Sequence, residues 1–147
     1  MRAAIYERGG PAAEVLELRD VPDPEPGPGE ARVRVTVSGV NPTDWKGRKR
    51  GGGEFERVIP NQDGAGVIDA VGEGVDPARV GERVWVYFAA WQSSFGTAAD
   101  LTVVPARRAV TLPDGIGDDL GASLGIPAMT AHRCLFGGGA PRDAAVP

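Results

Sequence analysis

The amino-acid sequence predicts a mainly β protein, a small and partly open β-barrel with two short helices near its C-terminal end. The first observation is the presence of 22 glycines and 13 prolines in 147 residues, which favours many short strands and turns over long helices. The second is a series of short apolar or alternating runs, closely spaced and separated by turn residues, as in barrels. The third is a change after residue 112, where apolar residues take up helical spacing. We expect one domain with its own core.

Residues 59–76 are the part of the chain around which the predicted barrel is organised. The triplet Gly64-Ala65-Gly66 resembles the start of a phosphate-binding G-x-G-x-x-G loop, but Asp69 occupies the third glycine position and no helical pattern follows. A short apolar strand follows instead, and Gly72-Glu73-Gly74 closes it with the chemistry of a tight reversal. We therefore expect a barrel corner whose backbone packs closely against a neighbouring segment, and not a nucleotide loop.

The clearest strand is predicted at 32–40, where three valines alternate with polar residues and share one face. These valines belong to the set that we expect to be buried: Val33, Val35, Val37, Val67, Ile68, Val84 and Val86. A second alternating run, 15–21, predicts a half-buried strand with Leu16 and Leu18 on one face. Further strands are predicted at 3–8, 84–88, 98–104 and 109–112.

Two of the connections between these strands carry distinctive side chains. Thr43 is expected to cap a short helical turn that begins at Asp44. The basic run 46–53 that follows is interpreted as a solvated loop rather than an anion site, because a basic run alone is a weak signal. Trp91 and Phe95 lie in a second irregular connection, where they are expected to plug an edge of the core, with pocket lining as the alternative.

The two helices are predicted after the last strand. The first begins with acidic residues at Asp118, which suit the positive end of a helix, and is broken by Gly125. The second begins at Pro127, whose fixed φ suits the first helical position, and continues to Phe136. Residues 137–147 are rich in glycine, alanine and proline without periodicity, so we expect a disordered tail after a domain formed by residues 1–136.

Charge and composition argue against several classes of partner. The net charge of −4 and a pI near 5.0 disfavour nucleic acid, which needs a basic face. Cys134 is the single cysteine, so an intrachain disulfide is impossible. The sequence contains no apolar run long enough to span a bilayer, and Glu7 places a charge where a signal peptide would need its apolar region. A cytoplasmic protein that binds neither nucleic acid nor membrane is the expectation.

The residue types needed for metal or triad chemistry are scarce. His132 is the single histidine, and Cys134 lies two positions further along the same predicted helix, so their side chains point to different faces and cannot supply a zinc site. A Ser-His-Asp triad would have to use His132, whose helical surroundings favour a structural role. Asp44 and Asp63 have no partner carboxylate that the sequence identifies.

Six motifs follow one another in the order of a known family. They read M-R-A-A-I-Y-E, P-E-P-G-P-G-E-A-R-V-R-V, G-V-N-P-T-D-W-K, P-N-Q-D-G-A-G-V-I-D-A-V-G-E-G-V, V-G-E-R-V-W-V and L-G-I-P-A-M-T-A-H-R. From Met1 to about Phe136 the chain resembles the N-terminal half of a medium-chain dehydrogenase/reductase, in the zinc-independent quinone oxidoreductase (zeta-crystallin-like) branch. The resemblance implies a GroES-like barrel, the alcohol dehydrogenase-like catalytic domain, which ends in the start of an interdomain helix.

The resemblance also implies a metal-free site and an NADP(H)-binding partner domain. Zinc-binding relatives carry Cys where this chain has Asn41, and a His-Glu pair where it has Gln62-Asp63. In the family a Rossmann domain follows this barrel, and its strand and glycine fingerprint do not follow Phe136 here. This ending agrees with three possibilities: a fragment, a truncated gene product or a free-standing relict.

Four site residues are implied by position in the family. Asn41 corresponds to the residue beside the nicotinamide and the substrate, and Thr130 to the threonine that holds the nicotinamide. Trp45 and Gln62 correspond to positions around the substrate cleft. Hydride transfer to an electron-poor acceptor needs positioning more than acid–base groups, which suits such side chains. The alternatives are an Asx-turn for Asn41 and a hydrogen bond from Thr130 to its own helix backbone.

Two hypotheses about function follow. In the first, the chain is the catalytic-domain portion of an NADPH-dependent reductase of quinones or α,β-unsaturated carbonyls, with a small-molecule substrate and a homodimer if a nucleotide-binding domain is present. In the second, it is a stand-alone barrel with a structural or interaction role. We expect the isolated chain to bind NADPH weakly or not at all, and its last helix to leave Met129 and Leu135 partly exposed.

Overall fold

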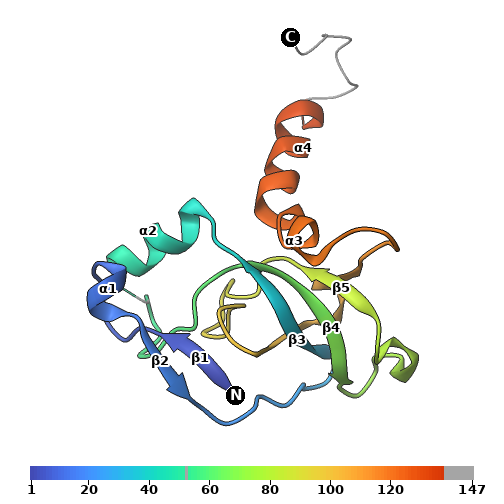
Figure 1. The fold of residues 1–147 in the computed structure, drawn as a ribbon, viewed down its shortest axis with the longest axis horizontal. Coiled ribbons are helices and arrows are strands. Elements are labelled where there is room, and N and C mark those ends of the chain that lie inside the picture. The colour runs from blue at the N-terminus through green and yellow to red at the C-terminus, as the bar shows by residue number, and fades with distance from the viewer. Residues whose placement is uncertain (52, 138–147) are drawn as a thin grey trace.

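The computed structural model describes residues 1–51 and 53–137, and two antiparallel sheets dominate it (Figure 1). Its strands are β1 (Arg2–Ile5), β2 (Glu17–Asp20), β3 (Glu30–Gly39), β4 (Asp63–Val71), β5 (Arg83–Val86), β6 (Leu101–Pro105) and β7 (Ala109–Thr111). The α-helices are α1 (Ala12–Val15), α2 (Pro42–Arg50), α3 (Asp118–Gly121) and α4 (Met129–Phe136), with short 3-10 turns at Pro77–Arg79 and Ala106–Arg108. β1 pairs with β2, and the larger sheet has the order β6-β3-β4-β5-β7. The prediction of a mainly β fold with open sheets is confirmed.

The main core lies on one face of the five-stranded sheet. Its fully buried side chains include Ala31, Val33, Ile68, Val84, Val86 and Val104. Burial is thus confirmed for four of the expected residues, whereas Val35, Val37 and Val67 are only half-buried. Two physical reasons account for the difference. Irregularities in the β3–β4 register, one of them between Val35 and Val37, interrupt the alternation, and Val67 precedes Ile68 in the same strand and so faces the opposite side.

The predicted close packing around the glycine-rich strand is confirmed. A Cβ atom at Gly66 would overlap the backbone carbonyl of Arg34 on β3, and one at Gly72 would overlap the carbonyl of Gly27. Only a residue without a side chain permits these approaches, which explains why glycine lies inside and directly after β4.

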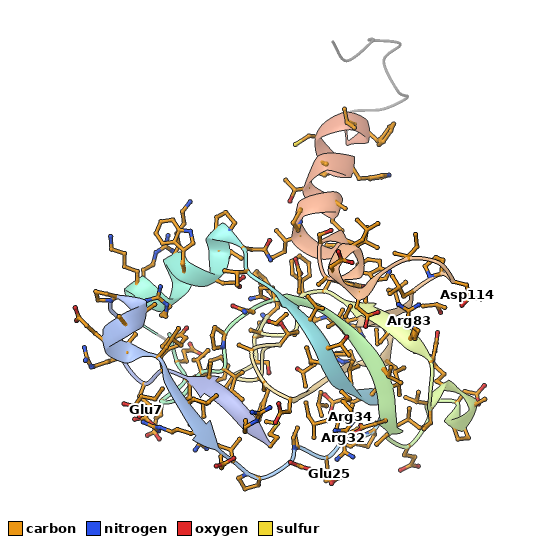
Figure 2. All side chains as sticks on the ribbon, in the orientation of Figure 1. Glu7, Glu25, Arg32, Arg34, Arg83 and Asp114 are labelled. Atoms are coloured by element: carbon orange, nitrogen blue, oxygen red, sulfur yellow. The ribbon has the colours of Figure 1, made fainter. Side chains whose placement is uncertain are left out.

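The polar face of β3 carries an ion-pair network that ties the sheet to the Pro-rich connection before it. Figure 2 shows Arg32 and Arg34 near one end of β3, with Glu25 close by. The Arg32 Nε lies 2.8 Å from Asp69 Oδ1, and Arg34 Nη2 lies 2.9 Å from Asp69 Oδ2 on the neighbouring strand β4. Arg32 also reaches Glu25 at 3.2 Å.

The prediction of a half-buried strand over 15–21 is wrong in its bounds and in its inner face. Val15 ends the short helix α1, and β2 begins only at Glu17. Leu18 is 74% exposed, whereas Val15 is buried against Tyr6. The cause is the side of the sheet on which Leu18 lies: it is opposite Ala4, whereas the core packs on the other face, which carries Ala3 and Ile5.

Most of the basic run is helical, and it does not form the predicted solvated loop. Residues 46–50 form the second half of α2, which begins at Pro42 and has Asn41, not Thr43, as its N-cap. Pro42 at the first helical position and a carboxylate at Asp44 favour this start, and the cationic residues suit the negative C-terminal end of the helix dipole.

Besides β2, four strands are shorter than predicted. β1 ends at Ile5 instead of residue 8, and β7 ends at Thr111 instead of residue 112. β5 stops at Val86, because the chain turns at Phe88, whose φ is 54°. β6 begins at Leu101, because residues 97–99 are irregular: the N–H groups of Thr97 and Ala98 donate to the carbonyls of Asn61 and Pro60, and the Ala98 carbonyl accepts the N–H of Ala4.

The C-terminal elements lie beside the sheet and then leave it. α3 begins at Asp118 as predicted, and Gly125 (φ −62°, ψ −114°) interrupts the helical path. Pro127 lies inside a single π-helical turn, Leu124–Ala128, so α4 begins two residues later than predicted. The predicted tail after Gly137 lies outside the described residues.

The last helix extends away from the sheets, with α3 near its base (Figure 1). No residue of α4 is buried, and Leu135 is 59% exposed. The predicted partial exposure of Met129 and Leu135 is therefore confirmed. Among the described residues no helix is long and apolar enough to cross a membrane.

Candidate functional site

An apolar pocket of about 390 Å³ lies where α4 leaves the barrel. The barrel contributes Gln62, Phe88 and Trp91 to its lining, and the C-terminal segment contributes Ile126, Met129 and Thr130. Thr43, at the start of α2, also borders it. An apolar cavity with a few polar groups at its wall is the usual form of a small-molecule site.

A larger hollow of about 640 Å³ lies elsewhere, between Glu7 and the segment Glu54–Arg57. It is lined mostly by charged side chains, with Phe55 as the apolar exception, so it offers less apolar surface to a ligand. The pocket at the base of α4 is therefore the better candidate site.

The structure brings some of the expected site residues together and not others. Gln62 and Thr130 both line the pocket, Gln62 from the barrel and Thr130 from α4. Asn41 is buried next to it, at the N-cap of α2. Trp45 does not line the pocket: it is 45% exposed, with the Lys46 ammonium 5.6 Å from its ring centre. The indole in the pocket belongs to Trp91, for which pocket lining was the alternative interpretation.

Asn41 joins two buried carboxylates. Its backbone N–H donates to Asp44 Oδ2 at 2.7 Å, which is half of a capping box at the start of α2. Its side-chain Nδ2 donates to Asp63 Oδ2 at 2.8 Å. The same residue thus starts α2 and holds a buried carboxylate, and it is not among the residues that line the pocket.

Both carboxylates are held away from water. Asp44 is 8% exposed, and burial raises its pKa to about 6, helped by the nearby charge of Asp63 and opposed by the Asn41 N–H. Asp63 is fully buried, and burial raises its pKa, against the opposing hydrogen bonds from Asn41 and Ile126. The sequence analysis missed this pair. The available signal was Asp44 three positions after an N-cap asparagine, which is capping-box spacing.

Asp63 also contacts the turn that leads into α4. Its Oδ2 accepts a hydrogen bond from the backbone N–H of Ile126 at 2.7 Å. A Cβ atom at Gly125 would overlap the Asp63 carboxyl group, so the turn lies directly on it. One carboxylate oxygen therefore receives a donor from the barrel and a donor from the C-terminal segment.

A second, more polar cavity of about 240 Å³ lies next to the first and shares Thr43 and Gln62 with it. Tyr6, Asp44 and Asn61 are among its lining residues. Asp44 Oδ1 and Gln62 Oε1 are buried and have no hydrogen-bond partner among the residues that the structure describes. These acceptors leave the region around Gln62 able to receive hydrogen-bond donors.

Within residues 1–51 and 53–137, no group of three histidine, cysteine, aspartate or glutamate side chains is placed to hold a metal ion. His132 and Cys134 are both exposed on α4, and the His132 ring lies 4.8 Å from that of Phe136.

Comparison with known proteins gives a consistent result. Residues 27–114 match the family described as the alcohol dehydrogenase GroES-like domain. The quinone oxidoreductase of Mus musculus is 36% identical over 145 residues, covering 92% of this chain and 40% of the mouse protein. The quinone oxidoreductase of Homo sapiens is 35% identical, with 92% of this chain and 41% of the human protein covered.

Solved structures agree with these relatives. A mycobacterial protein solved in complex with NADPH has a TM-score of 0.79 and 29% identity, covering 92% of this chain and 41% of that one. The chain thus spans about 40% of the length of the relatives that it matches. The family match covers most of the barrel described above, and the relatives extend the similarity on both sides of it. The chain belongs to the alcohol dehydrogenase GroES-like domain family, as a quinone oxidoreductase-like N-terminal domain of the medium-chain dehydrogenase/reductase superfamily.

Proposed function

We propose that this chain is the catalytic-domain portion of an oxidoreductase that transfers hydride from NADPH to quinones or α,β-unsaturated carbonyls without a metal ion. The observation that carries the proposal is the apolar pocket between the barrel and α4, with Gln62 on one wall and Thr130 on the other. The similarity to quinone oxidoreductases and to an NADPH-bound mycobacterial protein supports it.

The pocket suits a flat, electron-poor ring. Phe88 and Trp91 offer aromatic faces, with ring centres 5.8 Å apart, against which a quinone can stack. The side-chain amide of Gln62 can donate a hydrogen bond to a quinone oxygen and so polarise the carbonyl. About 390 Å³ accommodates one or two fused rings.

The nicotinamide end of a dinucleotide also fits these residues. The Thr130 hydroxyl and the flexible side chain of Met129 border the pocket from α4, where they could hold the carboxamide and one ring face. When bound, the nicotinamide supplies the hydride. With a nicotinamide bound, Gln62, Trp91 and Thr130 would hold the acceptor next to the hydride donor. The sequence contains no G-x-G-x-x-G loop to hold the pyrophosphate, so we propose weak NADPH binding by this chain alone.

The proposal of metal-free chemistry rests on the donors that are present. Asn41 and Gln62 carry amides, which are not usual zinc ligands. Asp44, Asp63 and Cys134 carry groups of a kind that zinc binds, but within residues 1–51 and 53–137 no three such groups converge. Without a Lewis acid, the acceptor carbonyl depends on hydrogen-bond donors such as the Gln62 amide.

Fluorescence quenching tests whether quinones enter this pocket. Titration of the chain with 1,4-naphthoquinone is expected to quench tryptophan fluorescence in a saturable way. Trp91→Phe should remove most of the saturable part, because Trp91 lines the pocket. Trp45→Phe is the matched control, since this exposed indole lies outside the pocket and its loss should leave the saturable part in place. Equal saturable quenching in wild type and Trp91→Phe would contradict the proposal.

The second candidate function is a stand-alone barrel with a structural or interaction role. The observation in its favour is the exposed apolar surface of α4, where Leu135 is 59% and Phe136 is 41% exposed. The same titration separates the two candidates, because a purely structural barrel has no reason to bind a quinone saturably.

A further inference from the structure

We infer that Asp63 is a positioning residue, whose buried carboxylate fixes the Leu124–Ala128 turn, and through it the α4 wall of the pocket, against the barrel. The contact stands on the geometry of this chain. The view that the positioned pocket binds quinones rests on the proposed function.

The first argument is the convergence of two donors on one oxygen. Asp63 Oδ2 receives Asn41 Nδ2 at 2.8 Å and the Ile126 N–H at 2.7 Å. Asn41 belongs to the barrel and Ile126 to the pocket wall that precedes α4. Since Asp63 is fully buried, water cannot replace the carboxylate as the acceptor for these two groups.

The second argument is the tight fit of the turn onto the carboxyl group. Gly125 is buried, and any side chain there would collide with the Asp63 carboxyl. Gly125 therefore allows this contact because it has no side chain, and its backbone is non-helical. Hydrogen bond and fit together define where the turn lies.

The third argument is that α4 has little other anchorage in this chain. No residue of α4 is buried, yet Met129 and Thr130 line the pocket. The position of these two side chains therefore follows from the turn that precedes them, which packs against β4, β5 and α3 and donates its Ile126 N–H to Asp63. A change at Asp63 should move the pocket wall even where the barrel stays folded.

Thr97 supplies a control for simple loss of stability. It is fully buried like Asp63, and its hydroxyl donates to the backbone carbonyl of Asp63 at 2.6 Å. Its contacts are with the barrel residues Asp63 and Ser38 and do not include the turn. Thr97→Val should weaken the barrel without changing the contact to Ile126.

The test compares Asp63→Ala, Asp63→Asn and Thr97→Val by amide hydrogen exchange and chemical shifts in NMR spectra of the 147-residue chain. Asp63→Ala leaves two buried donors unpaired, so the Ile126 amide should exchange at least about tenfold faster and the α4 amide signals should shift. Asp63→Asn keeps an oxygen acceptor and should restore most of the wild-type behaviour. Thr97→Val should leave the Ile126 amide as in wild type. Unchanged Ile126 exchange in Asp63→Ala, or an equal change in Thr97→Val, would overturn the inference.

A second variant covers the case in which Asp63→Ala does not fold. Gly125→Ala keeps the carboxylate and pushes the turn away from it, so it should speed Ile126 exchange in the same way. Unperturbed exchange in Gly125→Ala would overturn the inference. If wild-type chain binds 1,4-naphthoquinone, Gly125→Ala should weaken binding by on the order of tenfold while Thr97→Val does not. Absence of quinone binding in wild type would count against the proposed function alone, because Ile126 exchange is measured without quinone.

Discussion

Asp44 carries an ionisable group in a place that water hardly reaches. Its folded-state pKa of about 6 lies above its ordinary value of 3.8, so folding favours the protonated form. The stability that this preference provides is complete below about pH 4 and is lost as pH rises to 6 and above. The shift corresponds to about 3 kcal/mol. Asp44 lies in the first turn of α2, where it accepts the N–H of the N-cap residue Asn41, and it also lines the polar cavity beside the pocket.

We expect Asp44→Asn to change the pH dependence of stability. The amide oxygen can still accept the Asn41 N–H, while the ionisable group is gone. Relative to wild type, the free energy of unfolding of the variant should rise by about 2–3 kcal/mol between pH 4 and pH 7.5. Urea unfolding at a series of pH values measures this difference. Asp114→Asn, at an exposed acid (Figure 2), is the control and should show no such rise. A flat difference for Asp44→Asn would contradict the burial argument.

Among the elements, β3 and β4 pack against each other through close backbone contact as well as through side chains. β4 lies between β3 and β5, and Gly66 faces the carbonyl of Arg34 with no room for a methyl group. The obstacle is backbone on a central strand, which cannot move aside without breaking the pairing of the sheet.

Gly66→Ala should therefore destabilise the protein by about 3 kcal/mol or more, because overpacking against backbone cannot relax. Gly47→Ala is a control for which we expect the stability to rise instead of fall. Gly47 lies in α2 with open space around its missing Cβ, so alanine should stabilise the helix by about 0.5–1 kcal/mol. Thermal unfolding followed by circular dichroism measures both changes. A neutral Gly66→Ala would show that the strands are packed less closely than described.

For the molecule as a whole, the barrel forms one wall of the site described here and the α4 segment forms the other. We expect the 147-residue chain not to reduce quinones with NADPH at a useful rate, because nothing in its sequence holds the pyrophosphate and a freely moving nicotinamide gains little effective molarity. Loss of nicotinamide absorbance with a small quinone, together with calorimetry for NADPH, measures this. A full-length quinone oxidoreductase of the kind that this chain resembles is the positive control. Turnover, or micromolar affinity for NADPH, would show that the barrel has a cofactor site of its own.

Prediction from sequence succeeded where a pattern is local. The glycines around β4 are visible in a few consecutive residues, and the structure confirms the close packing that they imply. The alternation in β3 predicted the burial of Val33 correctly but not that of Val35 and Val37. Prediction failed where the outcome depends on a distant partner. Leu18 is exposed because it lies on the face of the two-stranded sheet opposite to the one that carries Ile5 into a core. The meeting of Asp63 with Ile126 joins segments far apart in the chain, and no local pattern encodes it.

The α4 helix can be treated as a lever with its pivot at Gly125. Phe136 lies roughly 16 Å along the helix from this pivot, so a rotation of about 10° there displaces the far end by roughly 3 Å. Met129 lies roughly 6 Å from the pivot and moves by roughly 1 Å, whereas Arg133 and Cys134, which also line the pocket, move further. We therefore expect a partner that packs on Leu135 and rotates α4 to change the width of the pocket, and to change it most at Arg133 and Cys134.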